Sequence, residues 1–137
     1  MTSTEPTSRT TTERWIDGHL DLAWIGLLRG DLSQPAPPDA AVSWPDLGAA
    51  GIDVAFGTIF TEMDGPPDDP AAYGTGDAAA ASAAGRRQLE WYREEERAGN
   101  LSIVHQLDDL ESASGPAIVL LMECADPIEN ATDAAWW

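Results

Sequence analysis

The stretch AIVLLME at residues 117–123 is the clearest guide to the fold of this chain. Six consecutive apolar residues end abruptly in a carboxylate, a pattern typical of a strand that is buried on both faces in a parallel sheet. Upstream, GIDVAFGTIFT at 51–61 is rich in β-branched and aromatic residues and is bounded by glycine and by an Asp-Gly-Pro-Pro turn. WIDGHLD at 15–21 begins apolar and ends polar. We expect a strand at each of these three stretches.

Helices are expected between these strands. Apolar residues recur at helical spacing over 22–28, and the Arg-Gly pair at 29–30 is a stop signal. Asp77 is a good N-cap for an alanine-rich helix that continues to residue 98. The Gly-Asn pair at 99–100 would end that helix. Each predicted helix therefore follows one strand and precedes the next.

The remaining segments are expected to be short or irregular. They are, in chain order, a proline-rich loop at 33–45, a second loop at 64–76, a brief extended piece at 101–104, a helical turn at 106–112 and the opening of another helix at 126–137. That last helix would be capped near Thr132 or Asp133.

The order strand, helix, strand, helix, strand and start of helix indicates an α/β fold with parallel strands and helices packed outside them. A complete eight-stranded (β/α)8 barrel needs about 200 residues or more. A chain of 137 residues with three strands cannot close one. The chain is therefore either a small open sheet or the first part of a larger fold.

The charge of the chain argues against several classes of function. It holds 24 acidic residues against seven basic ones, all of them arginine, which gives a formal charge of −17. Such a chain would repel nucleic acid and an anionic membrane surface. The acidity is typical either of a solvated surface or of adaptation to a salt-rich cytoplasm. No apolar stretch approaches the roughly 18 residues that span a bilayer.

The length indicates a single domain. Residues 1–14 are polar, rich in threonine and without an apolar signal-peptide segment, so we expect a disordered tail there and an ordered domain over 15–137. The one cysteine, Cys124, cannot form an internal disulfide. The cytoplasm is therefore the expected location.

Three side chains at strand ends are candidate metal ligands. His19 and Asp21 lie two residues apart in a strand and so point to the same side. Glu123 directly follows the apolar run, where a carboxylate is costly unless something pairs with it. In a parallel sheet all three would lie on one rim, and imidazole and carboxylate both bind zinc and similar divalent ions. The alternatives are a histidine hydrogen-bonded to a loop carboxylate and a Glu123 that is simply the first solvated residue.

Two further residues are weaker candidates. His105 has no partner at ligand spacing nearby and is expected to be structural or exposed. Cys124 follows Glu123, and its thiolate could add a ligand, although a small buried thiol is the more common outcome. The sequence contains no zinc-protease helix motif, Cys-x-x-Cys pair, phosphate-binding loop or Gly-x-Ser-x-Gly motif.

Four segments, taken together, are similar to segments of a known family. They are Asp-Gly-His-Leu-Asp-Leu at 17–22, the apolar strand at 51–61, Gln-Leu-Glu-Trp-Tyr at 88–92 and Leu-Met-Glu-Cys-Ala-Asp-Pro at 121–127. In order and spacing they resemble the opening motif, second strand, following helix and third-strand motif of the membrane (renal) dipeptidase family, peptidase family M19. The resemblance extends from Trp15 to the end of the chain.

This resemblance implies that the chain forms the first three β/α units of a (β/α)8 TIM barrel. It also implies a metallopeptidase that holds two zinc ions and hydrolyses dipeptides with a metal-activated water. His19 and Asp21 would bind one zinc ion, and Glu123 would bridge both. The family usually has glycine where this chain has Cys124, so the cysteine side chain could crowd the site. The resemblance identifies no substrate-binding residue within this chain.

The family's remaining histidine ligands follow the third strand, so we expect this chain to be an N-terminal part that is inactive alone. Open strand edges favour association, either as a homo-oligomer or with a complementing C-terminal half. Two alternatives remain. One is a non-catalytic acidic interaction module that binds a partner through its open edge. The other is a different binuclear hydrolase of the same superfamily, such as a deacetylase or a dihydroorotase-like enzyme; the absence of lysine counts against it, because the metal bridge there is often a carboxylated lysine.

Overall fold

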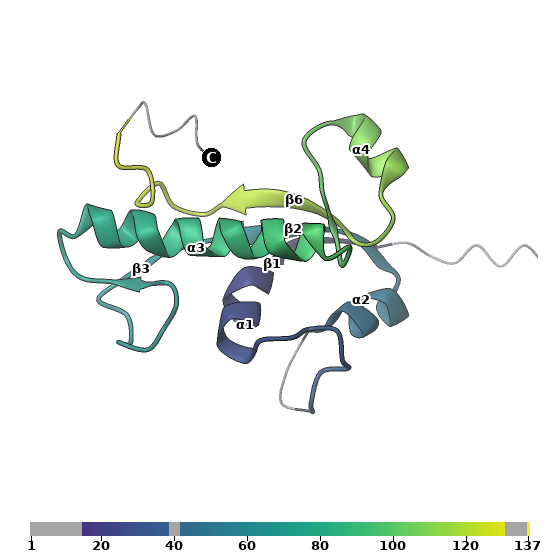
Figure 1. Ribbon diagram of the computed structural model, residues 1–137, viewed down its shortest axis with the longest axis horizontal. Helices are drawn as coiled ribbons and strands as arrows, with labels where there is room; N and C mark the ends of the chain where they lie inside the picture. Colours follow the sequence, from purple (N-terminus) through teal and green to yellow (C-terminus); the bar gives the residue numbers. More distant parts are fainter. Residues whose placement is uncertain (1–14, 39–41, 131–136) are drawn as a thin grey trace, which may run out of the picture.

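The computed structural model describes residues 15–38, 42–130 and 137 (Figure 1). The expected tail at 1–14 and the expected helix cap near Thr132 or Asp133 lie outside the described residues. The elements, in chain order, are β1 (Trp15–Leu20), α1 (Leu22–Arg29), α2 (Trp44–Ala50), β2 (Ile52–Ile59), β3 (Glu62–Met63), β4 (Ala72–Tyr73), α3 (Ala78–Arg97), β5 (Ser102–Ile103), α4 (Leu107–Ser112) and β6 (Ala117–Met122).

Four parallel strands form the main sheet, in the spatial order β1-β2-β6-β5. The predicted α/β fold with a parallel sheet is confirmed. β6 pairs with β2 through six consecutive residue pairs, from Val54–Ala117 to Ile59–Met122. The pairing of β1 with β2 is less regular, because its register shifts after Trp15 and again between Asp17 and Leu20.

The main sheet has one strand more than the sequence predicted. The extended piece at 101–104 becomes β5 because the Ser102 N–H donates to the Pro116 carbonyl at 3.0 Å and the Val104 N–H donates to the Ile118 carbonyl at 2.8 Å. β5 thus pairs with only the start of β6. A second, two-stranded sheet, β3–β4, flanks most of the expected loop at 64–76.

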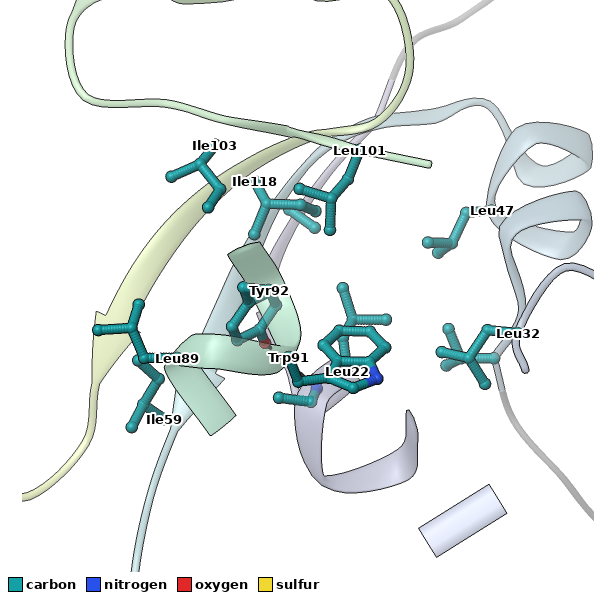
Figure 2. Close-up of a cluster of buried hydrophobic side chains, with 13 residues drawn as sticks. Leu22, Leu32, Leu47, Ile59, Leu89, Trp91, Tyr92, Leu101, Ile103 and Ile118 are labelled. Carbon is teal, nitrogen blue, oxygen red and sulfur yellow. Dashed lines mark hydrogen bonds between the residues drawn. The ribbon is translucent and has the colours of Figure 1, made fainter. Parts of the chain in front are cut away.

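Helices α1 and α3 contact each other and both contact β2, so they cover the same face of the sheet. Figure 2 shows the core that results: Leu22 of α1 lies beside Tyr92 of α3, and Leu89 and Ile118 complete the contact between α3 and the sheet. Leu22, Tyr92 and Ile118 are fully buried. Burial of these large side chains is the main stabilising contribution to the fold.

Helix α2 was not expected, and the proline-rich loop ends two residues earlier than predicted. The Ser43 side chain accepts a hydrogen bond from the Asp46 N–H and so caps the helix. Pro45 lies in the first turn, where a helix needs no backbone donor. A proline that is unsuitable for a helix interior is therefore compatible with this helix start.

The parallel arrangement brings the C-terminal ends of β1, β2 and β6 to one rim of the sheet. Figure 1 shows β3 toward the end to which the β6 arrow points, whereas α2 and α4 lie toward the opposite end. Side chains that follow the three strands are therefore placed together, in the position where α/β proteins commonly build their sites.

Candidate metal centre

His19, Asp21 and Glu123 converge at this rim. Each offers one ligand atom, and these atoms all lie within 4.8 Å of one another. His19 Nε2 is 2.8 Å from Glu123 Oε1 and 3.4 Å from Asp21 Oδ1. Among the residues that the structure describes, this is the one group of three or more histidine, cysteine or carboxylate side chains with such spacing. The structure thus brings together all three residues that the sequence singled out, although residue 21 and residue 123 are far apart in the chain.

Glu123 is placed by the regular part of the sheet. Its backbone N–H donates to the Ile59 carbonyl at 3.1 Å, which continues the β2–β6 ladder by one residue beyond the strand. The side chain is 34% exposed, so one face of the carboxylate remains open to solvent. A carboxylate held by a strand ladder and open on one side is suited to binding a cation.

Asp21 occupies the N-cap position of α1, yet its carboxylate does not cap the helix. The side chains at the N-caps of α2 and α3, Ser43 and Asp77, do accept backbone hydrogen bonds from their first turns. Asp21 Oδ1 instead accepts a hydrogen bond from the Thr58 hydroxyl at 2.5 Å. An Asp at an N-cap ordinarily accepts a hydrogen bond from a backbone N–H of the first turn, and the Asp21 side chain does not do so.

The backbone donor that Asp21 leaves free finds a partner on α3. The Ala23 N–H donates to the Tyr92 hydroxyl at 3.4 Å, and that hydroxyl donates to the Thr58 carbonyl at 3.0 Å. Burial raises the pKa of the Tyr92 hydroxyl well above its usual value of 10, and the nearby charge of Asp21 acts in the same direction. Tyr92 is therefore a neutral hydrogen-bond donor beside the site at any ordinary pH.

His19 is the most accessible of the three, with 56% of its side chain exposed. It lies where the register of β1 shifts against β2, and its backbone N–H donates to Asp17 Oδ1 at 2.9 Å. Irregularities of this kind re-aim a side chain at the end of a strand. Here the irregularity accompanies an imidazole that reaches the Glu123 carboxylate.

The turn after Glu123 is anchored to the neighbouring elements. The Tyr73 hydroxyl donates to Asp126 Oδ2 at 2.8 Å, and this hydrogen bond is the main cause that raises the pKa of Tyr73 to about 12. Pro127 is buried, and its ring lies against Gly85, where α3 has no side chain to exclude it. The backbone that follows the site is therefore fixed on both sides.

The three residues fit a divalent cation such as zinc. One imidazole nitrogen and two carboxylate oxygens are donors that zinc accepts, and bonds of about 2.0–2.2 Å in a tetrahedral site place neighbouring donors about 3.3–3.6 Å apart. The 3.4 Å between His19 and Asp21 matches that spacing. The 2.8 Å between His19 and Glu123 is a hydrogen-bond distance that would have to lengthen slightly. Three donors still leave positions for further ligands.

The two weaker candidates lie outside this cluster. Cys124 Sγ is 3.3 Å from the Thr61 hydroxyl and 3.9 Å from the Thr61 carbonyl, and the cysteine is partly buried. His105 precedes α4, where its backbone N–H donates to Asp109. Neither belongs to the group of converging ligand atoms.

Sequence reasoning missed Thr58, which contacts the site directly. A signal was available: Thr58 is a hydroxyl-bearing residue in the otherwise apolar second half of the strand, and a buried hydroxyl requires a partner. The side chain is completely buried, and Asp21 is that partner.

Comparison with known proteins returned no match: no protein-family model, curated protein or solved structure is significantly similar to this chain. The dipeptidase resemblance stays a prediction. In the part of the chain that the structure describes, no helix is both long enough and apolar enough to cross a bilayer.

Proposed function

We propose that this chain belongs to a zinc-dependent dipeptidase of the membrane dipeptidase type, in which His19, Asp21 and Glu123 hold zinc at the rim of a (β/α)8 barrel. The observation that supports the proposal is the convergence of these three side chains within 4.8 Å. They lie at the C-terminal ends of two parallel strands, β1 and β6, which is where barrel enzymes place their catalytic groups. The dipeptide substrate is inferred from the resemblance of the four sequence segments.

The one-sided packing of the helices supports a barrel over an open sheet. α1 and α3 lie on one face of the strands, and Leu47 of α2 belongs to the same core. An open doubly wound sheet carries helices on both faces, whereas the inner face of a barrel packs against its own strands. The edge of β1, and the part of β6 beyond its pairing with β5, would then be the places where further strands continue the barrel.

His19, Asp21 and Glu123 would bind and position the zinc ion. Zinc, when bound, supplies a Lewis acid and lowers the pKa of water. His19 would offer the Nε2 lone pair, and the two carboxylates would compensate the positive charge. All three side chains are partly exposed, at 56%, 38% and 34%, so a small substrate can approach them. Since further ligands are needed, we expect the chain alone to bind zinc without hydrolysing dipeptides.

The test is zinc affinity of the whole chain, measured by competition with a chromophoric chelator. We expect His19→Ala and Glu123→Gln each to weaken zinc binding at least about tenfold, because each removes a ligand. His105→Ala is the matched control, since it removes the other histidine of the chain and should leave the affinity unchanged. Circular dichroism of each variant confirms that the fold is retained. Equal zinc affinity in all four proteins would contradict the proposal.

A second candidate, a non-catalytic interaction module, is favoured by the edge strand β1. Trp15 and Ile16 are 58% and 68% exposed there, which is unusual for large apolar residues at a sheet edge. Under this alternative the chain would bind a protein partner, Trp15→Ser would weaken that binding, and zinc would have no effect. The two candidates therefore differ in their response to zinc.

A further inference from the structure

We propose that Thr58 is a positioning residue of the metal centre, whose buried hydroxyl aims the Asp21 carboxylate at His19 and away from helix α1. This inference rests on the proposed zinc site and adds to it a residue that binds no metal itself. Thr58 contacts the centre through its side chain, which bonds Asp21, and contacts α3 through its backbone carbonyl, which accepts from Tyr92.

The hydroxyl of Thr58 has two acceptors within reach, Asp21 Oδ1 at 2.5 Å and the Leu20 carbonyl at 3.3 Å. A hydroxyl has one proton to donate, and the nearer, charged acceptor is the stronger one. The proton therefore points to Asp21. Thr58 is completely buried, so no bulk water competes for that hydrogen bond.

This hydrogen bond decides between two uses of Asp21. From the N-cap position, an unrestrained carboxylate would turn to the backbone N–H groups of the first turn of α1. With Oδ1 held by Thr58, it stays 3.4 Å from His19 Nε2. The Thr58–Asp21 hydrogen bond thus fixes the Asp21 carboxylate relative to His19 before a cation binds. This lowers the free-energy cost of assembling the metal site.

Helix α3 holds the segment that contains Thr58 in place. The Tyr92 hydroxyl donates to the Thr58 carbonyl at 3.0 Å. Gln88, one helical turn earlier and also fully buried, brackets Phe60: its Nε2 donates to the Phe60 carbonyl at 2.5 Å, and its Oε1 accepts the Phe60 N–H at 3.2 Å. The end of β2 is therefore clamped on both sides of Ile59.

The same three-residue segment contacts both acidic residues of the centre. Thr58 holds Asp21 through its hydroxyl, and the Ile59 carbonyl holds the backbone of Glu123. Residues 58–60, which α3 fixes from behind, thus hold the Asp21 carboxylate and the Glu123 backbone relative to each other. Packing alone does not require a hydroxyl here, because valine has nearly the same shape as threonine.

The experiment compares Thr58→Val with Thr58→Ser on the whole chain. Thr58→Val removes the hydroxyl at nearly constant volume, and we expect zinc affinity to fall about 10- to 100-fold, as for other residues that orient a ligand. Thr58→Ser keeps the donor and should restore most of the affinity. Thr75→Val is the matched control, because the Thr75 hydroxyl donates to Asp64 and contacts none of the three ligands. The absorption spectrum of bound Co²⁺ should change in Thr58→Val only.

The outcomes separate this inference from the proposed function. If the unmodified chain binds no zinc, the metal centre itself is refuted. If it binds zinc and Thr58→Val binds equally well with the same Co²⁺ spectrum, the centre stands and the role of Thr58 is refuted. Equal losses in Thr58→Val and Thr58→Ser would show a packing role and would also overturn it. Should Thr58→Val fail to fold, Thr58→Ala removes the same hydroxyl without placing a methyl group beside the carboxylate, and the same comparison applies.

Discussion

The two strands that flank β2 pair with it in different ways. β6 matches β2 through six consecutive residue pairs without a break. β1 matches it at four positions with two shifts of register between them. A regular ladder gives a rigid core, whereas an irregular one frees side chains from the alternation of a strand. The comparison suggests that this chain uses β6 for packing and β1 for presenting polar groups.

The candidate centre combines both kinds of pairing. Glu123 extends the regular ladder through its N–H, while His19 and Asp21 come from the irregular side. The irregular side is secured by side chains instead of a ladder: Thr58 holds Asp21, and Tyr92 links Ala23 to β2. Four predictions test this division of roles.

The largest effect is expected at Gly57, which faces the core between β2 and α3. A Cβ added there would lie 2.6 Å from Ile118 Cγ2 and 2.7 Å from the Tyr92 hydroxyl, too close for either neighbour. We expect Gly57→Val to lower the free energy of unfolding by about 3 kcal/mol, because the rigid ladder cannot yield to overpacking. Urea unfolding followed by circular dichroism measures the loss.

Gly18, in the irregular strand β1, is the matched comparison. A Cβ added there meets no atom within 4 Å, and valine is a good strand former. Gly18→Val should therefore change the free energy of unfolding by no more than about 0.5 kcal/mol. Similar losses at Gly18 and Gly57 would mean that the two pairings do not differ in rigidity.

A smaller effect is expected at Tyr92, whose hydroxyl joins the β1–α1 junction to β2. Tyr92→Phe keeps the ring and removes the hydrogen bonds to the Thr58 carbonyl and from the Ala23 N–H. Loss of a buried hydroxyl that satisfies backbone groups costs about 1–2 kcal/mol. Tyr73→Phe is the control: its hydroxyl bonds Asp126 at the surface, so the loss should be smaller. A larger loss at Tyr73 would show that the turn after β6, rather than the β1 junction, depends on a tyrosine.

The three main strands could be predicted from the sequence because each is long enough to show a pattern. The continuous apolar run at 117–123 and the β-branched run at 51–61 both form strands where expected. β5 was expected only as a brief extended piece at 101–104, and the β3–β4 pair was not expected, since strands of two residues show no periodicity and form only when a partner strand is in place. α2 is not evident from the sequence because Pro45 indicates a loop. The helix forms there because Ser43 caps it and the proline lies in its first turn.

The convergence of the candidate ligands followed from topology. His19, Asp21 and Glu123 end strands, and parallel strands end at one rim, so their meeting depends on little beyond the strand assignment. The position of Thr58, and the hydrogen bonds by which Gln88 and Tyr92 of α3 hold the end of β2, could not be predicted in the same way. Which face of β2 meets Gln88 and Tyr92 depends on the register of a helix against a sheet, and short-range pattern does not fix that register.

The last prediction concerns the pH dependence of the Tyr92→Phe loss. Burial raises the pKa of Tyr92 in the folded protein above its usual value of 10, so the unfolded chain ionises first. The stability that a neutral Tyr92 contributes is complete below pH 10 and declines as the pH rises toward the folded-state pKa. The gap between the unmodified chain and Tyr92→Phe should therefore shrink by about 0.8 kcal/mol between pH 8 and pH 10.5. The chain has no lysine, and Tyr73 is present in both proteins, so its titration cancels in the difference. A gap that stays constant up to pH 10.5 would mean that Tyr92 ionises at its ordinary pKa, and that the hydroxyl between β1 and β2 is open to solvent.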